Sequence, residues 1–217
     1  MREDLTQRRF IEETYRIIST EGREALSIRR LARDMRCNSA NIYRYFKDLD
    51  ELVTYASLRY LTAYLGDVAV CYAKSETTYQ THVAVWDCFS RHAFANGPIF
   101  DNLFFGRHSR MLNDIIKNYY AMFPEDLSGL SPSIANIFSE GSFNNRDYLM
   151  ISRCVDEGWF TEEDAKFLNS FSIHLFLGYL KELLQKEPSE KLSKSYHDDF
   201  MATLVKIMDY FLSLIHI

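Results

Sequence analysis

Apolar residues recur along this chain with the three- and four-residue spacing of amphipathic helices. In the N-terminal part, the pattern predicts a first helix that ends at Gly22, a second helix capped by Ser27 and a third helix that begins at Ser39. Asp48 and Glu51 then mark the start of a long fourth helix. The apolar positions of the first three helices are Phe10, Ile11, Ile17, Ile18, Ile28, Leu31, Ala32, Met35, Ile42, Tyr43 and Phe46.

The rest of the chain carries further helical patterns, separated by breaks that contain glycine or proline. A sustained two-residue alternation, which would predict strands, is missing from the sequence. We therefore expect an all-α fold. A boundary near Asp48 divides it into an N-terminal three-helix module, residues 1–48, and a larger helical body, residues 49–217. The fourth helix, roughly Asp50 to Ala73, joins the two.

Two C-terminal segments are more apolar than one buried face requires. The segment from Thr161 to Lys186 is apolar on several faces, and the last helix repeats apolar residues at helical spacing. Two such helices from each of two chains could form a four-helix interface, which predicts a homodimer; in the alternative interpretation both helices are interior. The residues predicted at the dimer interface are Phe171, Leu175, Gly178, Leu204, Met208 and Phe211.

Composition excludes several classes of protein. With 47% hydrophobic residues, a chain of 217 residues can bury a core without metal or disulfide cross-links. Cys37, Cys71, Cys88 and Cys154 stand far apart, with no Cys-x-x-Cys pair and no clustered histidines, so we expect free thiols, no metal site and no cofactor. The charged N-terminus lacks a secretory signal, and no apolar run is long enough for a membrane span. We expect a cytoplasmic protein with no membrane partner.

Charge is distributed unevenly along the chain. The net charge is −5, yet the stretch from Arg23 to Lys47 holds seven basic residues against Glu24 and Asp34. This stretch would attract a phosphate backbone and the rest of the chain would repel it. The difference would orient the protein relative to the nucleic acid as the two molecules meet. The alternative is an ordinary solvated basic face.

Two short helices joined by about three residues and packed on a preceding helix form a helix-turn-helix, whose second helix can enter the major groove of DNA. Arg29 and Arg30 stand beside the N-terminus of the first of these helices, where positive charge and free backbone N–H groups suit a phosphate. Side chains on or near the exposed side of the second that can donate to phosphates or base edges are Ser39, Asn41, Arg44 and Tyr45.

The stretch ALSIRRLARDMRCNSANIYRYFKDLDELV, Ala25 to Val53, resembles the TetR family of transcription regulators. The family pattern is met by Ser27, Arg29, Leu31, Ala32, Ile42, Tyr43 and Phe46. The resemblance implies phosphate contacts from Ser27 and Tyr43, a base contact from Arg29, and readers at Ser39, Ala40 and Asn41. It also implies a homodimeric, ligand-responsive repressor that binds a palindromic operator and is released by a small, partly apolar effector bound in the helical body.

Two residues depart from the family pattern. Arg36 stands where the family usually has the turn glycine, so either the turn differs or Arg36 takes a left-handed conformation at some cost. Leu49 replaces a lysine that contacts phosphate, and Lys47 can substitute only if its geometry permits.

Aromatic stripes in the body are candidates for an effector pocket, although core packing is the commoner role of such stripes. The candidates are Trp86, Phe89, Phe104, Tyr119 and Phe138. His82, His92 and His174 are further candidate ligand contacts, or ordinary hydrogen-bonded or exposed histidines.

Two other functions compete with DNA binding. An enzyme has little support, because the sequence lacks nucleophile-elbow, dinucleotide-binding, phosphate-loop and His-Glu-x-x-His motifs, and we expect none. The second is a protein-binding adaptor that keeps the helix-turn-helix without specific DNA binding, which the departures at Arg36 and Leu49 keep open.

Overall fold

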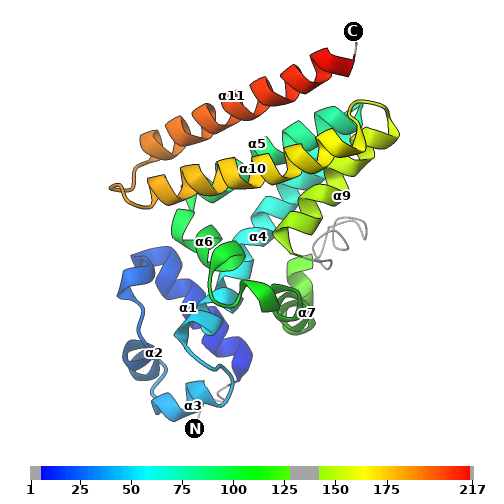
Figure 1. Cartoon of the computed structure of the whole chain (residues 1–217). Coiled ribbons are helices and arrows are strands. Elements are labelled where there is room, and N and C mark those ends of the chain that lie inside the picture. Colours follow the sequence, from blue (N-terminus) through cyan, green and yellow to red (C-terminus); the bar gives the residue numbers. More distant parts are fainter. Residues whose placement is uncertain (1–5, 128–141, 216–217) are drawn as a thin grey trace. The chain divides into compact units, whose positions relative to one another are not determined.

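The computed structural model describes residues 6–127 and 142–215, and every regular element in these ranges is helical, as the sequence predicts (Figure 1). The α-helices are α1 (Gln7–Glu21), α2 (Ile28–Asp34), α3 (Ser39–Tyr43), α4 (Leu49–Lys74), α5 (Thr78–Ala95), α6 (Gly97–Phe105), α7 (Leu112–Met122), α9 (Phe143–Asp156), α10 (Glu162–Leu183) and α11 (Glu190–Ile215). Short 3-10 helices are η1 (Arg23–Ala25), η2 (Ser109–Met111) and η3 (Pro124–Leu127).

The chain divides into two compact units. The first comprises Met1–Thr62 and Pro98–Ser128, and the second comprises Ala63–Gly97 and Gly129–Ile217. The first unit includes the start of α4 because the residues there, Leu52 and Ala56 among them, are fully buried. The predicted functional boundary at residue 48 lies inside this unit and stays a prediction.

The helix ends of the first unit follow from local side-chain chemistry. Gly22 ends α1 with a φ of 87°, a left-handed value that glycine adopts without steric cost. The Ser27 hydroxyl accepts the Arg30 backbone N–H at 3.1 Å and so caps α2, as predicted. Asp48 accepts the Glu51 N–H at 2.8 Å while the Glu51 carboxylate accepts the Lys47 N–H at 2.6 Å, which sets the start of α4.

The second unit is a helical bundle with an aromatic centre. Helix α5 packs against α9, α10 and α11. Helix α10 also packs against α9 and α11, and Figure 1 shows α10 and α11 alongside each other. A capping box of Thr161 and Asp164 begins α10. Rings that meet in the core of this unit are those of Trp86, Phe89, Phe94, Phe143, Phe176 and Phe200. Among the described helices, none combines the length and hydropathy that a membrane span requires.

Candidate nucleic-acid interface

The short helix α3 is anchored from one side and exposed on the other. Ile42 and Phe46 are buried in the core of the first unit, together with Leu31 of α2. Burying such a side chain contributes about 1.5–3 kcal/mol, so these residues fix the orientation of α3. Tyr43 is 55% exposed, and Arg44 follows it as the C-terminal cap of the helix. The predicted inward positions of Ile42 and Phe46 and the outward positions of Arg44 and Tyr45 are confirmed, whereas Tyr43, counted among the apolar positions, is exposed. The helix itself ends at Tyr43, before its apolar pattern does.

Several cations around α2 and α3 are available to a ligand. Arg29, Arg36 and Arg44 are exposed and have no ion-pair partner within residues 6–127 and 142–215. Lys47 is also exposed, with its Nζ 3.9 Å from the Met111 Sδ, a weak contact. Leu49, where the family has a lysine, is half-buried at the first position of α4. Lys47 is therefore the exposed cation nearest along the chain to the position that the family fills with lysine.

Arg30 has partners within the protein that the sequence did not predict. Its guanidinium lies 2.6 Å from the Glu21 carboxylate and 3.2 Å from the Asp34 carboxylate, and it donates to the Ala25 carbonyl at 3.2 Å. The hydrogen bond from Arg30 lowers the pKa of both carboxyl groups below their ordinary values. These partners take three of the five guanidinium N–H donors, so Arg30 joins α1 to α2, and its predicted phosphate contact stays a prediction.

The smaller polar residues at the start of α3 have local partners of their own. Ser39 donates its hydroxyl to the Asn38 side chain at 3.3 Å, and that side chain also accepts the Ala40 N–H at 3.0 Å. The Asn41 side chain hydrogen-bonds the Cys37 thiol. These contacts orient Ser39 and Asn41 without burying them, since Ala40 is exposed and its two neighbours are half-buried. Their predicted contacts with bases stay a prediction.

The turn between α2 and α3 contains Arg36 in a left-handed conformation. Its φ is 50°, and no other non-glycine residue in the described ranges has a positive φ. The conformation costs an L-residue about 1–2 kcal/mol relative to its ordinary regions. Of the two outcomes that the sequence left open for this position, the structure has the strained backbone. The arginine also places an exposed positive charge in the turn, which glycine would not offer.

The predicted effector-pocket residues mostly fill cores. Trp86 and Phe89 belong to the aromatic centre of the second unit, whereas Phe104 and Tyr119 belong to the first unit, where Tyr119 stacks on Phe123. All four are buried. The remaining candidate, Phe138, lies outside the described residues. Their burial fits the alternative interpretation, core packing, and contact with an effector stays a prediction.

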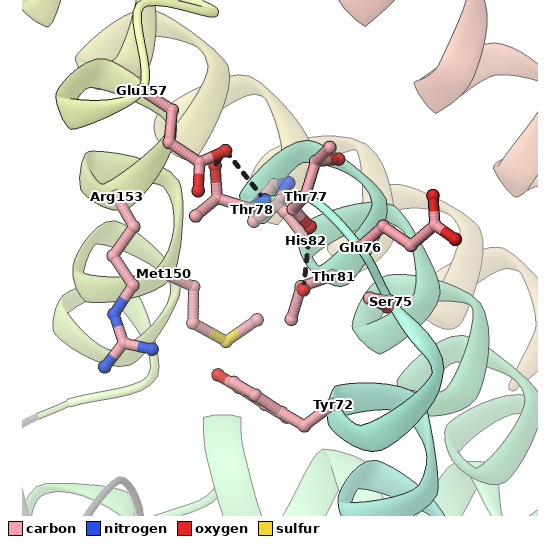
Figure 2. Close-up of a pocket in the computed structure, with 10 residues that line it drawn as sticks. All are labelled: Tyr72, Ser75, Glu76, Thr77, Thr78, Thr81, His82, Met150, Arg153 and Glu157. Carbon is pink, nitrogen blue, oxygen red and sulfur yellow. Dashed lines mark hydrogen bonds between the residues drawn. The ribbon is translucent and has the colours of Figure 1, made fainter.

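A cavity of about 220 Å³ lies elsewhere in the second unit (Figure 2). Its lining is polar, and it is formed by the end of α4, the start of α5 and one side of α9. The Glu157 carboxylate accepts hydrogen bonds from the Thr78 backbone N–H at 3.0 Å and from the Thr78 hydroxyl at 2.7 Å. This carboxylate therefore caps the N-terminus of α5. Figure 2 shows Met150 pointing from α9 toward Thr81, with Arg153 beside it on the same helix. The lining residues are Tyr72, Ser75, Glu76, Thr77, Thr78, Thr81, His82, Met150, Arg153 and Glu157.

The three histidines singled out from the sequence have hydrogen-bond partners. The buried His82 lies 3.1 Å from the Asp147 carboxylate, and it also lines the cavity. His174 is exposed, with its Nδ1 2.7 Å from the Ser170 carbonyl oxygen. His92 contacts Asp67 at 2.8 Å. The cavity was missed by sequence analysis because its lining comes from three elements and follows no apolar period.

The predicted dimer residues divide into two groups. Leu204 and Met208 are fully buried within the chain, so they belong to the core of the second unit and not to an outer surface. Phe171, Leu175 and Phe211 are half-buried and Gly178 is exposed. Large apolar side chains that are exposed on the same two helices are Phe167, Tyr210 and Leu214. Phe167 contacts Phe171 and Phe211, with ring centroids at 5.9 and 5.3 Å.

No protein-family model matches the sequence, and no curated protein does. Solved structures do share its fold. A protein of unknown function from Rhodococcus sp. RHA1 is 15% identical, with a TM-score of 0.52, and the match covers 93% of this chain and 96% of that one. The TetR family transcriptional regulator PfmR from Thermus thermophilus is 18% identical over 89% of this chain and 97% of that one, with a TM-score of 0.46.

A bacterial regulatory protein in the TetR family from Rhodococcus RHA1 is 12% identical, with 98% of each chain covered and a TM-score of 0.48. Among these three, the structure with a TM-score above 0.5 is the Rhodococcus protein of unknown function, and its likeness extends along most of the chain. At these identities the likeness concerns the fold alone.

Proposed function

We propose that this chain is a DNA-binding transcription regulator that reads an operator with α3. The observation that carries the proposal is the arrangement of α3, whose Ile42 and Phe46 are buried while Tyr43 and Arg44 are exposed. Exposed, unpaired Arg29 and Arg36 flank it within the described first unit. A fixed helix with outward donors suits the major groove, and the flanking cations suit phosphates on either side of it.

The chain would bind as a homodimer through α10 and α11. Phe167, Tyr210 and Leu214 leave large apolar side chains in water next to the half-buried Phe171 and Phe211. Neighbouring exposed apolar side chains on a water-facing surface are typical of a protein interface. A two-fold dimer would present two copies of α3 to two half-sites about 34 Å apart, which predicts a palindromic operator.

Release by an effector is the third part of the proposal. The cavity beside α5 offers hydroxyl groups, Arg153 and His82, which favours a small polar molecule over the partly apolar one expected from the sequence. An effector that stabilises a conformation with wrongly spaced copies of α3 must weaken DNA binding, and DNA must weaken effector binding equally. The TetR resemblance makes repression the expected direction.

The experiment that tests the proposal is selection of bound sequences from a random duplex DNA pool at one stated salt concentration. We expect a palindromic site, and we expect Arg44→Ala to weaken binding to it. A matched control is Lys166→Ala, which removes an exposed cation from α10 in the second unit. Because the control removes the same charge from a different element, it separates a local contact from a general loss of charge.

Recovery of no specific sequence by a folded dimer at low salt would overturn DNA binding. It would favour the protein-binding adaptor instead. Equal weakening by Arg44→Ala and Lys166→Ala would assign binding to net charge and not to α3.

A further inference from the structure

Four side chains that commonly bind transition metals meet between α4 and α5. Asp67 and Cys71 are one helical turn apart on α4, and Cys88 and His92 are one turn apart on α5. Residues four apart on a helix lie on the same face, so each helix presents a pair of candidate ligands. All four belong to the second unit. The sequence suggested widely spaced cysteines without a histidine partner, and folding brings Cys71, Cys88 and His92 together.

The separations within this cluster are short. One ligand atom from each of Asp67, Cys88 and His92 lies within 4.8 Å of the other two. The His92 Nε2 and an Asp67 carboxylate oxygen are 2.8 Å apart. The Cys71 thiol donates to the Ala84 carbonyl at 3.6 Å, and the side chains of Cys71 and Cys88 are near enough for each to affect the pKa of the other. Cys71 is the fourth candidate ligand, outside the group of three whose atoms lie within 4.8 Å of one another.

The four side chains of the cluster differ in solvent exposure. Cys88 is 1% exposed, Cys71 and His92 are partly exposed, and the Asp67 side chain is 56% exposed. The ring of Tyr64 meets that of His92 edge-on at 5.8 Å, which limits how the imidazole can turn. The Asp67 side of the cluster therefore faces solvent, whereas the Cys88 side is in the interior of the second unit.

We infer that Asp67, Cys71, Cys88 and His92 form a binding site for Zn²⁺. Two sulfurs, one imidazole nitrogen and one carboxylate oxygen are a donor set typical of tetrahedral zinc, whereas Mg²⁺ and Ca²⁺ take oxygen ligands. Both thiols would lose their protons to solvent on binding, and the ion would then replace the hydrogen bond between His92 and Asp67. This inference is independent of the proposed function.

The geometry needs only small adjustments. Metal–ligand bonds of about 2.0–2.3 Å place the ligand atoms of a tetrahedral zinc site roughly 3.3–3.8 Å apart. The separations among Asp67, Cys88 and His92 are 4.8 Å or less, so the widest pair would close by about 1 Å, whereas the His92 Nε2 and the Asp67 oxygen, 2.8 Å apart, would move apart by about 0.5 Å. The exposed Asp67 side chain can make much of this change by rotation.

The test uses the full-length protein, reduced, freed of metal with a chelator, and titrated with Co²⁺ as a spectroscopic stand-in for Zn²⁺. We expect binding of one ion per chain, a near-ultraviolet band from thiolate-to-cobalt charge transfer, and the visible bands of tetrahedral Co²⁺, all removed by added Zn²⁺. Cys71→Ser and His92→Gln should each lower the affinity by more than the 10–100-fold that loss of an outer-shell partner typically costs.

Cys154→Ser and Cys37→Ser are the matched controls, because they remove thiols on α9 and near α3 and should leave the titration unchanged. Asp67→Asn is a second variant of a largely exposed side chain, which keeps the test valid if a buried cysteine variant fails to fold. A cobalt spectrum without the thiolate band would overturn the inference. The inference would also be overturned if Cys71→Ser gave the same cobalt spectrum as the unchanged protein.

Discussion

At the scale of single residues, Arg36 is the clearest case of backbone strain. Because its φ is 50°, Arg36→Gly should raise the free energy of unfolding by roughly 0.5–1 kcal/mol, the relief of strain being partly offset by the greater freedom of glycine in the unfolded chain. Equilibrium urea denaturation measures the change. Arg36→Ala is the control, since it removes the same charge but keeps a Cβ. An equal gain from both variants would assign the effect to charge.

Tyr43 and Asn41 should differ in what they contribute to DNA binding. Tyr43→Ala should weaken binding to all sequences alike, because Tyr43 is exposed and its predicted contact is with a phosphate, which carries no sequence information. Asn41→Ala should instead change the preferred sequence, with discrimination against other bases falling by about 1–3 kcal/mol if the amide pairs bidentately with a base edge. Fluorescence-anisotropy titrations against the selected operator and its single-base variants measure both. A uniform loss for Asn41→Ala would contradict its role as a reader.

At the scale of elements, the start of α5 depends on a carboxylate from another part of the chain. Hydrogen bonds from the Thr78 backbone N–H, the Thr78 hydroxyl and the Trp159 indole lower the pKa of Glu157 below its ordinary value. A carboxyl whose pKa is lowered by folding stabilises the fold above its unfolded pKa, about 4.3 for glutamate, and that contribution is lost as the pH falls through the folded pKa.

Glu157→Gln should therefore lower the melting temperature at pH 7, and the difference from the unchanged protein should shrink as the solution is made acidic. Thermal unfolding followed by circular dichroism across this pH range measures it. Glu187→Gln is a suitable control, because Glu187 is exposed between α10 and α11. A difference that is constant with pH would show that the side chain acts by packing and not by charge.

At the scale of the whole molecule, the exposed apolar residues on α10 and α11 govern the proposed dimer. Phe167→Glu should convert the dimer to a monomer, because Phe167 is 48% exposed and a charge there would be buried on association. Light scattering coupled to gel filtration measures the mass. Leu149→Glu on α9, at a similarly exposed apolar residue, is the matched control and should leave the mass unchanged.

Operator affinity should fall together with dimer formation in the Phe167 variant, since a monomer contacts one half-site only. The selected palindrome and a single half-site, titrated side by side, measure this. Unchanged affinity for the palindrome in a monomeric variant would contradict binding as a dimer.

Much of the local structure was predictable from the sequence for simple physical reasons. Gly22 and Ser27 end and begin helices through backbone freedom and a side-chain hydrogen bond, both of which act over a few residues. The anchoring of α3 by Ile42 and Phe46 was predictable too, because helical periodicity fixes which side chains share a face. Helix order follows from these local rules, whereas the exposure of Tyr43, an apolar position of the same pattern, does not.

Only the tertiary structure decided which side chains of separate elements pair with each other and which are buried. Arg30 pairs with carboxylates of two helices, Leu204 and Met208 face the core, and Glu157 caps a helix distant in sequence. A helical period specifies a face but not its partner, since every apolar stripe fits a core and an interface equally well. Asp67, Cys71, Cys88 and His92 converge for the same reason: the sequence fixes each pair by one helical turn, and the packing of α4 against α5 joins the pairs.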